Sequence, residues 1–383
     1  DGRYVLGATL AIGRDLTLQS ANGPAGALVD GNAAVRCLNL DSGGAIVRGL
    51  TFSNGQGTVT ASGVYLTGGM LTNCVVKSCR SYRAVYASSG TVVECVITRN
   101  IVGNGGGLQL AGGVARGCTI IGNSGTPSGV GVYLSGGVLA DSTVVGNASS
   151  DGPGAGIYMT GGTASICSIS GNSIAAWHQN GGGVYLTGGI LMNSVISSNT
   201  VGTGNGSSSG GGVVGTGGAV RNCLIRGNIA DNGGGANVSG GAWENCTLVG
   251  NQGRGTGGGM YKPGAAGPVT NCIVYYNTAP NSTNIGPTLT SVGHSCAPEL
   301  TSGLGNITSP PLFIAPGSGY GPGHVPGDYR LHFRSATCNA GTNQAWMAIA
   351  TDLEGDGRIL NAVVDMGAYE TLIPAPGTVF VVR

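Results

Sequence analysis

Charged side chains are scarce in this sequence. Lys, Arg, Asp and Glu together make up 9% of 383 residues, and 17 basic residues against 16 acidic ones leave a net charge of +1. A nucleic-acid-binding surface needs a clustered excess of Lys and Arg, which this balance does not provide. No stretch of 18 consecutive apolar residues occurs either, so the sequence predicts no membrane span.

Aromatic residues are also few, at 5%, whereas Gly occupies 77 positions. Gly costs roughly 1 kcal/mol at each helix-interior position, which argues against a helical domain or a coiled coil. The glycines follow no three-residue period, which excludes collagen. A hydrophobic content of 41% argues against disorder. The chain should therefore fold without long helices.

What the sequence does contain is a recurring twelve-residue block of Gly-Gly, four residues, a Cys-type position, four residues and Asn. "GGVARGCTIIGN" (112–123) is one of six close copies, which lie at 112–123, 136–147, 161–172, 188–199, 217–228 and 240–251. Looser copies lie at 43–54, 68–79 and 89–100, and "NCIVYYN" (271–277) ends a copy with an insertion. Length varies only after the Asn.

Short strands joined by two tight corners and one elastic corner are typical of a parallel β-solenoid. We therefore expect an all-β, single-stranded parallel β-helix of about eleven turns, with three strands in each turn stacked about 4.8 Å from their counterparts. The expected organisation is turns over residues 1–295, a capping section over 296–370, and a linker plus strand over 371–383.

The Cys-type positions should stack as a row inside the solenoid, with Ser142 and Ser194 substituting in two turns. Small, soft side chains suit a narrow interior, and cysteines that face the same way lack disulfide geometry. Packing is the favoured interpretation, with a redox or metal role as the alternative. The row consists of Cys74, Cys95, Cys118, Cys167, Cys223, Cys246 and Cys272.

The block-ending asparagines should form a second row at a turn. An Asn there can bond its own backbone and its stacked copies, and it tolerates the left-handed conformation of a corner. The row consists of Asn100, Asn123, Asn147, Asn172, Asn199, Asn228, Asn251 and Asn277. We interpret these residues as structural, not as ligands.

The turns of the type "GGGVYLTGG…NC.I..N" resemble those of right-handed parallel β-helix repeat proteins on bacterial surfaces, including the polymorphic outer-membrane type. The run "DYRLHFRSATCNAGTNQAWMAIATDLEGDGRILNAVVDMGAYE" (328–370) resembles the ending that closes such helices. The resemblance covers essentially the whole chain. It implies a right-handed helix and a non-enzymatic extracellular or cell-surface protein of a bacterium.

The closing section contains three further candidates. Cys296 and Cys338 lie outside the Cys row and are a candidate disulfide in an exported protein. Asp352, Glu354 and Asp356 alternate like the first half of a Ca²⁺ loop, but Val363 stands where the bidentate Glu belongs. We interpret this stretch as a polar turn, with weak Ca²⁺ binding as the alternative and no other cofactor expected.

An active site is not expected. A β-helix lyase or hydrolase needs carboxylates gathered on one face, whereas Glu94, Asp141 and Glu244 are separated by turns that lack an acid. Trp177 and His178 lie on a long loop, where they could contact a surface glycan or, for Trp177, cover its own turn. The expected function is structural, as a rod or fibre, with an adhesin as the alternative and a polysaccharide lyase or hydrolase held as a minor one.

The last residues form a candidate assembly strand. Thr378, Val379, Phe380, Val381 and Val382 follow a Pro- and Gly-containing spacer and read as a strand without a partner. Such a strand could complete the first turn of a following copy, in tandem or head to tail between chains. The alternative is an arbitrary fragment boundary. The expected partner is therefore the protein itself, with surface glycans as a second one.

Overall fold

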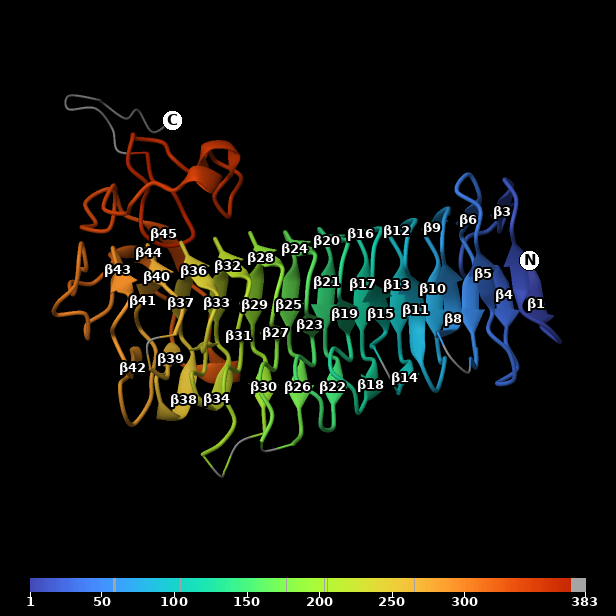
Figure 1. Ribbon diagram of the computed structural model, residues 1–383, viewed down its shortest axis with the longest axis horizontal. Coiled ribbons are helices and arrows are strands. Elements are labelled where there is room, and N and C mark those ends of the chain that lie inside the picture. Colours follow the sequence, from blue (N-terminus) through green and yellow to red (C-terminus); the bar gives the residue numbers. More distant parts are fainter. Residues whose placement is uncertain are drawn as a thin grey trace.

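The computed structural model describes residues 1–57, 60–103, 105–176, 178–202, 204, 206–264 and 266–372. These residues form a parallel β-solenoid, with the N-terminus at one end and the C-terminal section beside the other (Figure 1). The predicted all-β class is confirmed. The described strands complete twelve turns rather than about eleven, because residues 2–19 and 285–293 form turns without the twelve-residue block.

Sheet A contains the strand that follows each Cys-type position. Its members in stacking order are β1 (Gly2–Val5), β4 (Ala27–Asp30), β7 (Thr51–Ser53), β10 (Val75–Lys77), β13 (Val96–Thr98), β17 (Thr119–Ile121), β21 (Thr143–Val145), β25 (Ser168–Ser170), β29 (Val195–Ser197), β33 (Leu224–Arg226), β37 (Thr247–Val249) and β41 (Ile273–Val274).

Sheet B contains the strand that precedes each glycine pair. Its members are β2 (Leu10–Ile12), β5 (Leu38–Leu40), β8 (Ala61–Leu66), β11 (Arg83–Ala87), β15 (Leu108–Leu110), β19 (Val132–Leu134), β23 (Ile157–Met159), β27 (Val184–Leu186), β31 (Val213–Gly215), β35 (Ala236–Val238), β39 (Met260–Lys262) and β42 (Ile285–Pro287).

Sheet C contains the strand between the glycine pair and the Cys-type position. Its members are β3 (Thr17–Gln19), β6 (Ile46–Arg48), β9 (Met70–Thr72), β12 (Thr91–Val93), β16 (Val114–Arg116), β20 (Val138–Ala140), β24 (Thr163–Ser165), β28 (Ile190–Met192), β32 (Ala219–Arg221), β36 (Ala242–Glu244), β40 (Val269–Thr270) and β43 (Val292–Gly293).

A fourth sheet, D, was not expected. Short strands pair at the start of the elastic corner, directly after the Asn row, in β14 (Ile101–Val102), β18 (Ser124–Gly125), β22 (Ala148–Ser149), β26 (Ser173–Ile174), β30 (Thr200–Val201), β34 (Ile229–Asn232) and β38 (Gln252–Thr256). The loops vary in length only beyond this sheet. Two-residue strands carry too little alternation to be recognised in a sequence.

The core follows from strict register between turns. In sheet A, Ile97 pairs with Ile120 and Ile120 with Val144, and all three side chains are buried. Their neighbours in each strand point outward because successive side chains alternate across a strand. Each inward residue therefore packs on its equivalent in the next turn, and the interior becomes a set of aliphatic rows.

The tight corners depend on left-handed backbone at fixed positions. Gly113, the second glycine of its pair, has φ of 69°, and a Cβ there would lie 2.4 Å from the Gly90 carbonyl oxygen. The left-handed residue of the next corner precedes the Asn row, as in Arg99 (φ 54°) and Gly122 (φ 64°). The expectation that the asparagines themselves supply this conformation is wrong, because their side chains must point inward to stack.

The Asn row is a continuous hydrogen-bonded ladder in the interior, which confirms the predicted stacking. In a typical step, Asn147 donates its backbone N–H and its side-chain Nδ2 to Asn172 Oδ1, both at 3.0 Å. Asn147 Nδ2 also donates to Ile120 O at 3.1 Å, on the preceding turn. The ladder begins with the Cys79 N–H and extends past Asn277 to Asn284, whose own N–H donates to Glu299 Oε1 at 2.9 Å.

The seven cysteines of the Cys row are buried, and their thiols donate to carbonyl groups of the corner and of the preceding turn. Cys246 Sγ, for example, lies 3.4 Å from Glu244 O and 3.6 Å from Val220 O. Ser142 and Ser194 take the same place and donate to Ala140 O and Met192 O, both at 2.7 Å. A hydroxyl and a thiol therefore satisfy the same carbonyl at this corner.

The C-terminal section contains an antiparallel pair, β44 (Phe313–Ala315) and β45 (Asp328–Leu331), and two short 3-10 helices, η1 (Gly321–Gly323) and η2 (Ala345–Ile349). It lies along the flank of the last turns (Figure 1). Phe313, Tyr329 and Met366 pack on outward side chains of sheet A, such as Val249 and Ile273. The start of the predicted capping section, at Ala297 and Leu300, covers the end of the core, and the remainder docks on the flank.

Candidate functional site

The carboxylates of the turns do not gather. Glu94 and Asp141 are exposed corner residues two turns apart, and Glu244 pairs with Arg221 at 2.5 Å. Asp231 is buried and accepts N–H groups from the corner loop of the preceding turn, from Gly204 at 3.2 Å and Gly206 at 3.1 Å. Among the described residues, no group of three His, Cys, Asp or Glu side chains is arranged to hold a metal ion.

The three candidate calcium ligands, Asp352, Glu354 and Asp356, lie in different environments. Asp352 is buried, and its Oδ1 accepts the N–H groups of Glu354, Gly355 and Asp356 at 2.8, 2.9 and 3.0 Å. Its Oδ2 accepts the Glu370 N–H at 2.9 Å. Glu354 and Asp356 are exposed. Asp352 therefore holds a polar turn together, as in the first interpretation of this stretch.

The candidate disulfide is not formed in the structure. Cys296 and Cys338 are both free thiols. Cys296 Sγ donates to Ser309 O at 3.3 Å, and Cys338 Sγ donates to His332 O at 3.6 Å. Both pack against the cluster that joins the C-terminal section to sheet A, where burial raises the pKa of each thiol to about 12. Each thiol therefore has a carbonyl partner of its own, and the two sulfur atoms are not joined.

The glycan candidates remain a prediction. His178 is an exposed residue of the elastic corner, and Trp177 lies outside the described residues. Thr378, Val379, Phe380, Val381 and Val382 of the candidate assembly strand also lie outside them. Among the described residues, no helix has the length and apolar character that a membrane crossing requires.

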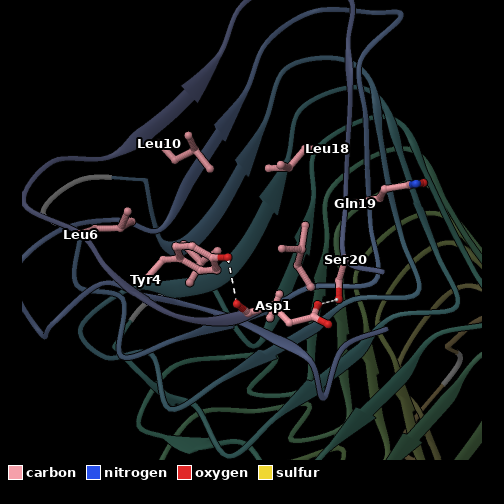
Figure 2. Close-up of a pocket in the computed structure, with 10 residues that line it drawn as sticks. Asp1, Tyr4, Leu6, Leu10, Leu18, Gln19 and Ser20 are labelled. Atoms are coloured by element: carbon pink, nitrogen blue, oxygen red, sulfur yellow. Dashed lines mark hydrogen bonds between the residues drawn. The ribbon is translucent and has the colours of Figure 1, made fainter. Parts of the chain in front are cut away.

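A hollow with mostly apolar walls lies at the N-terminal end of the core. Figure 2 shows Tyr4, Leu6, Leu10 and Leu18 around it, with Asp1 and Ser20 on its rim. The hollow has a volume of about 310 Å³ and reaches the second and third turns at Ala27, Val29 and Leu50. We call it the open mouth. Its walls are the inward rows of the solenoid, which here lack a further turn among the described residues.

The strands around the open mouth have one unpaired side. β1, β2 and β3 each pair with a single described neighbour, β4, β5 and β6. In β3, Leu16 O accepts the Ile46 N–H at 2.9 Å and the Ser20 N–H donates to Arg48 O at 3.3 Å. The main-chain groups of Thr17 and Gln19 therefore point the other way, because alternate residues of a parallel strand bond opposite neighbours.

The opposite end of the core is closed by the chain itself. Leu289, Val292, Ala297 and Leu300 continue the aliphatic interior beyond the last full turn. Glu299 terminates the Asn ladder by accepting the Asn284 N–H. At this end, the aliphatic residues and Glu299 therefore cover the last turn of the core.

A second row of asparagines, which sequence reasoning missed, holds the C-terminal section on the flank. These residues precede the Cys-type position in consecutive turns and have left-handed backbone: Asn193, Asn222, Asn245 and Asn271. Asn222 Nδ2 donates to Thr351 O at 3.0 Å, and Asn245 Nδ2 to Asp365 O at 3.1 Å. The repeated "NC" and "NS" pairs were the available signal. Four earlier turns, from Glu94 to Ile166, have other residues there.

Asn271 makes the closest docking contact of this outer row. Its Nδ2 donates to Thr342 O at 2.9 Å, and its Oδ1 accepts the Thr342 N–H at 2.8 Å. Its backbone carbonyl accepts the Gly367 N–H at 2.7 Å. The Asn271 side chain thus hydrogen-bonds both the N–H and the carbonyl of Thr342, and this pair of bonds fixes the position of the C-terminal section along the solenoid.

A buried ionic network lies where the described chain ends. Arg358 Nη2 is 3.3 Å from Glu370 Oε1 and donates to Asp365 O at 3.1 Å. Asp365 Oδ2 accepts the Thr371 N–H at 2.8 Å, and Asp352 Oδ2 accepts the Glu370 N–H. Burial raises the pKa of Glu370 to about 8, against the opposing attraction of Arg358. Three buried carboxyl groups thus lie around one guanidinium, which is ion-paired with Glu370, and burial likewise raises the pKa of Asp365.

Charge is distributed unevenly along the rod. Residues 31–120, next to the open mouth, carry seven basic and two acidic side chains, a formal charge of +5. Residues 296–372 carry three basic and seven acidic side chains, a formal charge of −4. Arg48, Lys77, Arg80, Arg99 and Arg116 are exposed in the first group. The near-zero total therefore conceals a separation of charge between the two ends.

Comparison with known proteins assigns this chain to no family. The chain matches no protein-family model and no curated protein. It is similar to the crystal structure of pectate lyase Pel9A, with a TM-score of 0.34 and 13% sequence identity over 96% of this chain and 86% of that chain. At that level, the likeness bears on neither activity nor substrate. The resemblance to bacterial surface proteins therefore stays a prediction.

Proposed function

We propose that this chain is an extracellular structural protein that associates end to end into a fibre at a bacterial cell surface. The observation that carries the proposal is the stack of twelve turns, which builds an extended rod, together with the uneven charge along that rod. Unlike surfaces that bind each other make a heterologous contact, which propagates into a filament when it does not close into a ring.

The separation of charge along the rod supports a head-to-tail arrangement of copies. A positive group of turns beside the open mouth would approach the negative C-terminal section of another copy. Such complementarity directs encounter and disfavours a head-to-head arrangement. The scattered carboxylates of the turns favour a structural role over polysaccharide cleavage, since no acid–base pair lies on one face of the described solenoid. The location at a cell surface rests on the sequence resemblance.

Electron microscopy combined with light scattering tests this proposal. The full chain of 383 residues should form unbranched rods whose length increases with protein concentration and decreases with added salt, because the charged ends are screened. A chain that stays monomeric over the whole concentration range would contradict the proposal. Monomeric rods that bind a glycan array would instead favour the adhesin alternative.

A further inference from the structure

We propose that Cys37 and Cys79 are a disulfide site that joins the second and fourth turns of the solenoid across the third. Cys37 directly precedes β5, and Cys79 takes the place of the ladder asparagine after β10, so the two lie outside the Cys row. Both side chains are fully buried, and both are free thiols in the structure. This pairing does not depend on end-to-end assembly.

In the regular turns, a glycine stands opposite each ladder asparagine. This glycine directly precedes the sheet B strand, as Gly131 and Gly156 do. A Cβ on Gly131 would lie 2.9 Å from Asn147 Nδ2, and a Cβ on Gly156 would lie 2.9 Å from Asn172 Nδ2. Each level of this corner therefore has room for one inward side chain, which comes from the wall that carries the asparagine.

The first turns reverse this pattern at one level. Gly55 takes the ladder position of the third turn, and a Cβ there would lie 3.0 Å from Cys37 Sγ. At the next level the usual pattern returns, and a Cβ on Gly63 would lie 3.0 Å from Cys79 Sγ. Cys37 and Cys79 thus enter one interior column from opposite walls, at adjacent levels about 4.8 Å apart.

The two thiols meet inside this column. Cys37 Sγ donates to Ser53 O at 3.4 Å. Cys79 Sγ donates to Lys77 O at 3.4 Å, and Lys77 pairs with Ser53 across β10 and β7. A hydrogen bond to the Cys37 side chain, together with burial, raises the pKa of the Cys79 thiol well above its ordinary value. The sulfur atoms are therefore neighbours.

Contacts within the Cys row have a different geometry. Cys74 and Cys95 also hydrogen-bond through their side chains, but they hold equivalent positions in neighbouring turns, since Val75 pairs with Val96. Their Cα–Cβ bonds are therefore parallel and about 4.8 Å apart, whereas a disulfide needs Cβ atoms about 3.8 Å apart. Side chains that approach from opposite walls, as at Cys37 and Cys79, can close that gap.

The bond would reinforce the turns that the amide ladder does not reach. The ladder begins at the Cys79 N–H, and Gly55 has no side chain to continue it into the third turn. A disulfide from residue 37 to residue 79 closes a long loop and restricts the unfolded chain. Oxidised glutathione is a sufficient oxidant: the two thiols lose two protons and two electrons as the S–S bond forms, and glutathione disulfide is reduced to two thiols.

Refolding the full chain in a glutathione redox buffer tests this site. The parent should lose the mass of two hydrogen atoms, and mapping without reduction should join the peptides that contain Cys37 and Cys79. Cys37→Ala should keep all its thiols, whereas Cys74→Ala, in the Cys row, should still form the bond. A parent that retains eleven free thiols, or that links other cysteines only, overturns the proposal.

Hydrogen exchange of residues 27–77 then measures what the bond does. Reduction of the parent should speed the opening of these turns at least about tenfold, because the loop constraint is lost. Cys79→Ser, which keeps a small polar side chain, should open at one rate with and without reductant, and circular dichroism checks that it is folded. Equal opening rates in the oxidised and reduced parent would contradict the reinforcing role.

Discussion

The solenoid and the C-terminal section bury polar groups of different chemistry. In the solenoid, neutral amides stack, and each Asn of the inner ladder bonds a backbone N–H, a side-chain amide and a carbonyl of neighbouring turns. In the C-terminal section, several buried polar groups are ionisable, and Arg358 is ion-paired with Glu370 and lies near Asp365 and Asp352. Repetition allows the first solution, since the same side chain recurs about every 4.8 Å.

This difference implies that the two regions respond differently to mutation and to pH. A ladder of neutral amides is insensitive to protonation, and each step can be broken singly. An ionic network loses stability as a unit, because removing one partner leaves the remaining charges buried without compensation. The C-terminal section should therefore be the region whose attachment to the flank can be altered by a single charge.

The largest effect should come from Arg358→Met. Without the guanidinium, three carboxyl groups are buried together, and the loss should be about 4 kcal/mol in the stability of the docked section. Hydrogen exchange should show residues 309–372 unprotected while sheet A keeps its protection. Arg330→Met, at an exposed ion pair with Asp328, is the control and should change little. Equal effects of both variants would contradict the importance of burial.

The next effect should come from breaking the inner ladder at Asn172→Leu. The Asn147 N–H and the Val144 carbonyl then lose their side-chain partner inside the core. Buried unsatisfied groups cost about 1–3 kcal/mol each, so we expect a loss of about 3 kcal/mol in urea unfolding. Asn73→Gly, an exposed left-handed corner position, should be nearly neutral. A neutral Asn172→Leu would mean that the ladder only follows the fold.

A smaller effect should come from the outer row. Asn271→Ala removes two hydrogen bonds to Thr342 and should loosen the C-terminal section by about 2 kcal/mol. Asn73→Ala alters the same corner position in a turn far from the docked section, and it measures the cost of Ala in left-handed backbone. If exchange around residues 339–343 were equal in both variants, the docking role of Asn271 would be wrong.

Between pH 7 and pH 8, the pH response of the docked section should be the smallest of these effects. The pKa of Glu370 is about 8 in the folded state against 4.5 for an ordinary Glu, so above pH 4.5 the undocked section has released a proton that the docked one keeps. Stability of docking therefore decreases as pH rises from about 4.5 to about 8 and levels off above that range. Between pH 7 and 8 the loss is at most about 1.4 kcal/mol.

Glu370→Gln provides the control for this response. An amide cannot titrate, so exchange protection of residues 309–372 should become less dependent on pH, with only the raised pKa of Asp365 contributing in the same direction. The solenoid should show no such response in either protein. An unchanged pH profile in Glu370→Gln would assign the response to another group.

Much of the solenoid could be predicted because the same twelve-residue block recurs in successive turns. The block spacing located the strands of sheets A and C, the Asn ladder and the elastic corner, since each error in one turn is corrected by its neighbours. Sheet D was missed because its strands are short and unpatterned. The left-handed residue was placed one position too late, at Asn123 instead of Gly122, because spacing alone does not show which residue points inward.

The candidate sites were harder to predict from the sequence than the solenoid. The outer asparagines, such as Asn222, have the same local pattern as the undocked Asn73, and only the path of the C-terminal section distinguishes them. The buried pairing of Arg358 with Glu370 was hidden for the same reason, because an ion pair within an irregular section has no period. The open mouth could not be predicted, because its lining comes from three different turns whose stacking is known only from the structure.

The amino-acid sequence by itself determined the repeating part of this protein: strand stacking, inward aliphatic rows and the amide ladder all follow from local patterns multiplied over many turns. The tertiary structure decided where the C-terminal section docks and which carboxyl groups lie around Arg358. The physical reason is that contacts between neighbouring turns are specified by a common period, whereas a contact such as that of Asn271 with Thr342 depends on a single arrangement of distant segments.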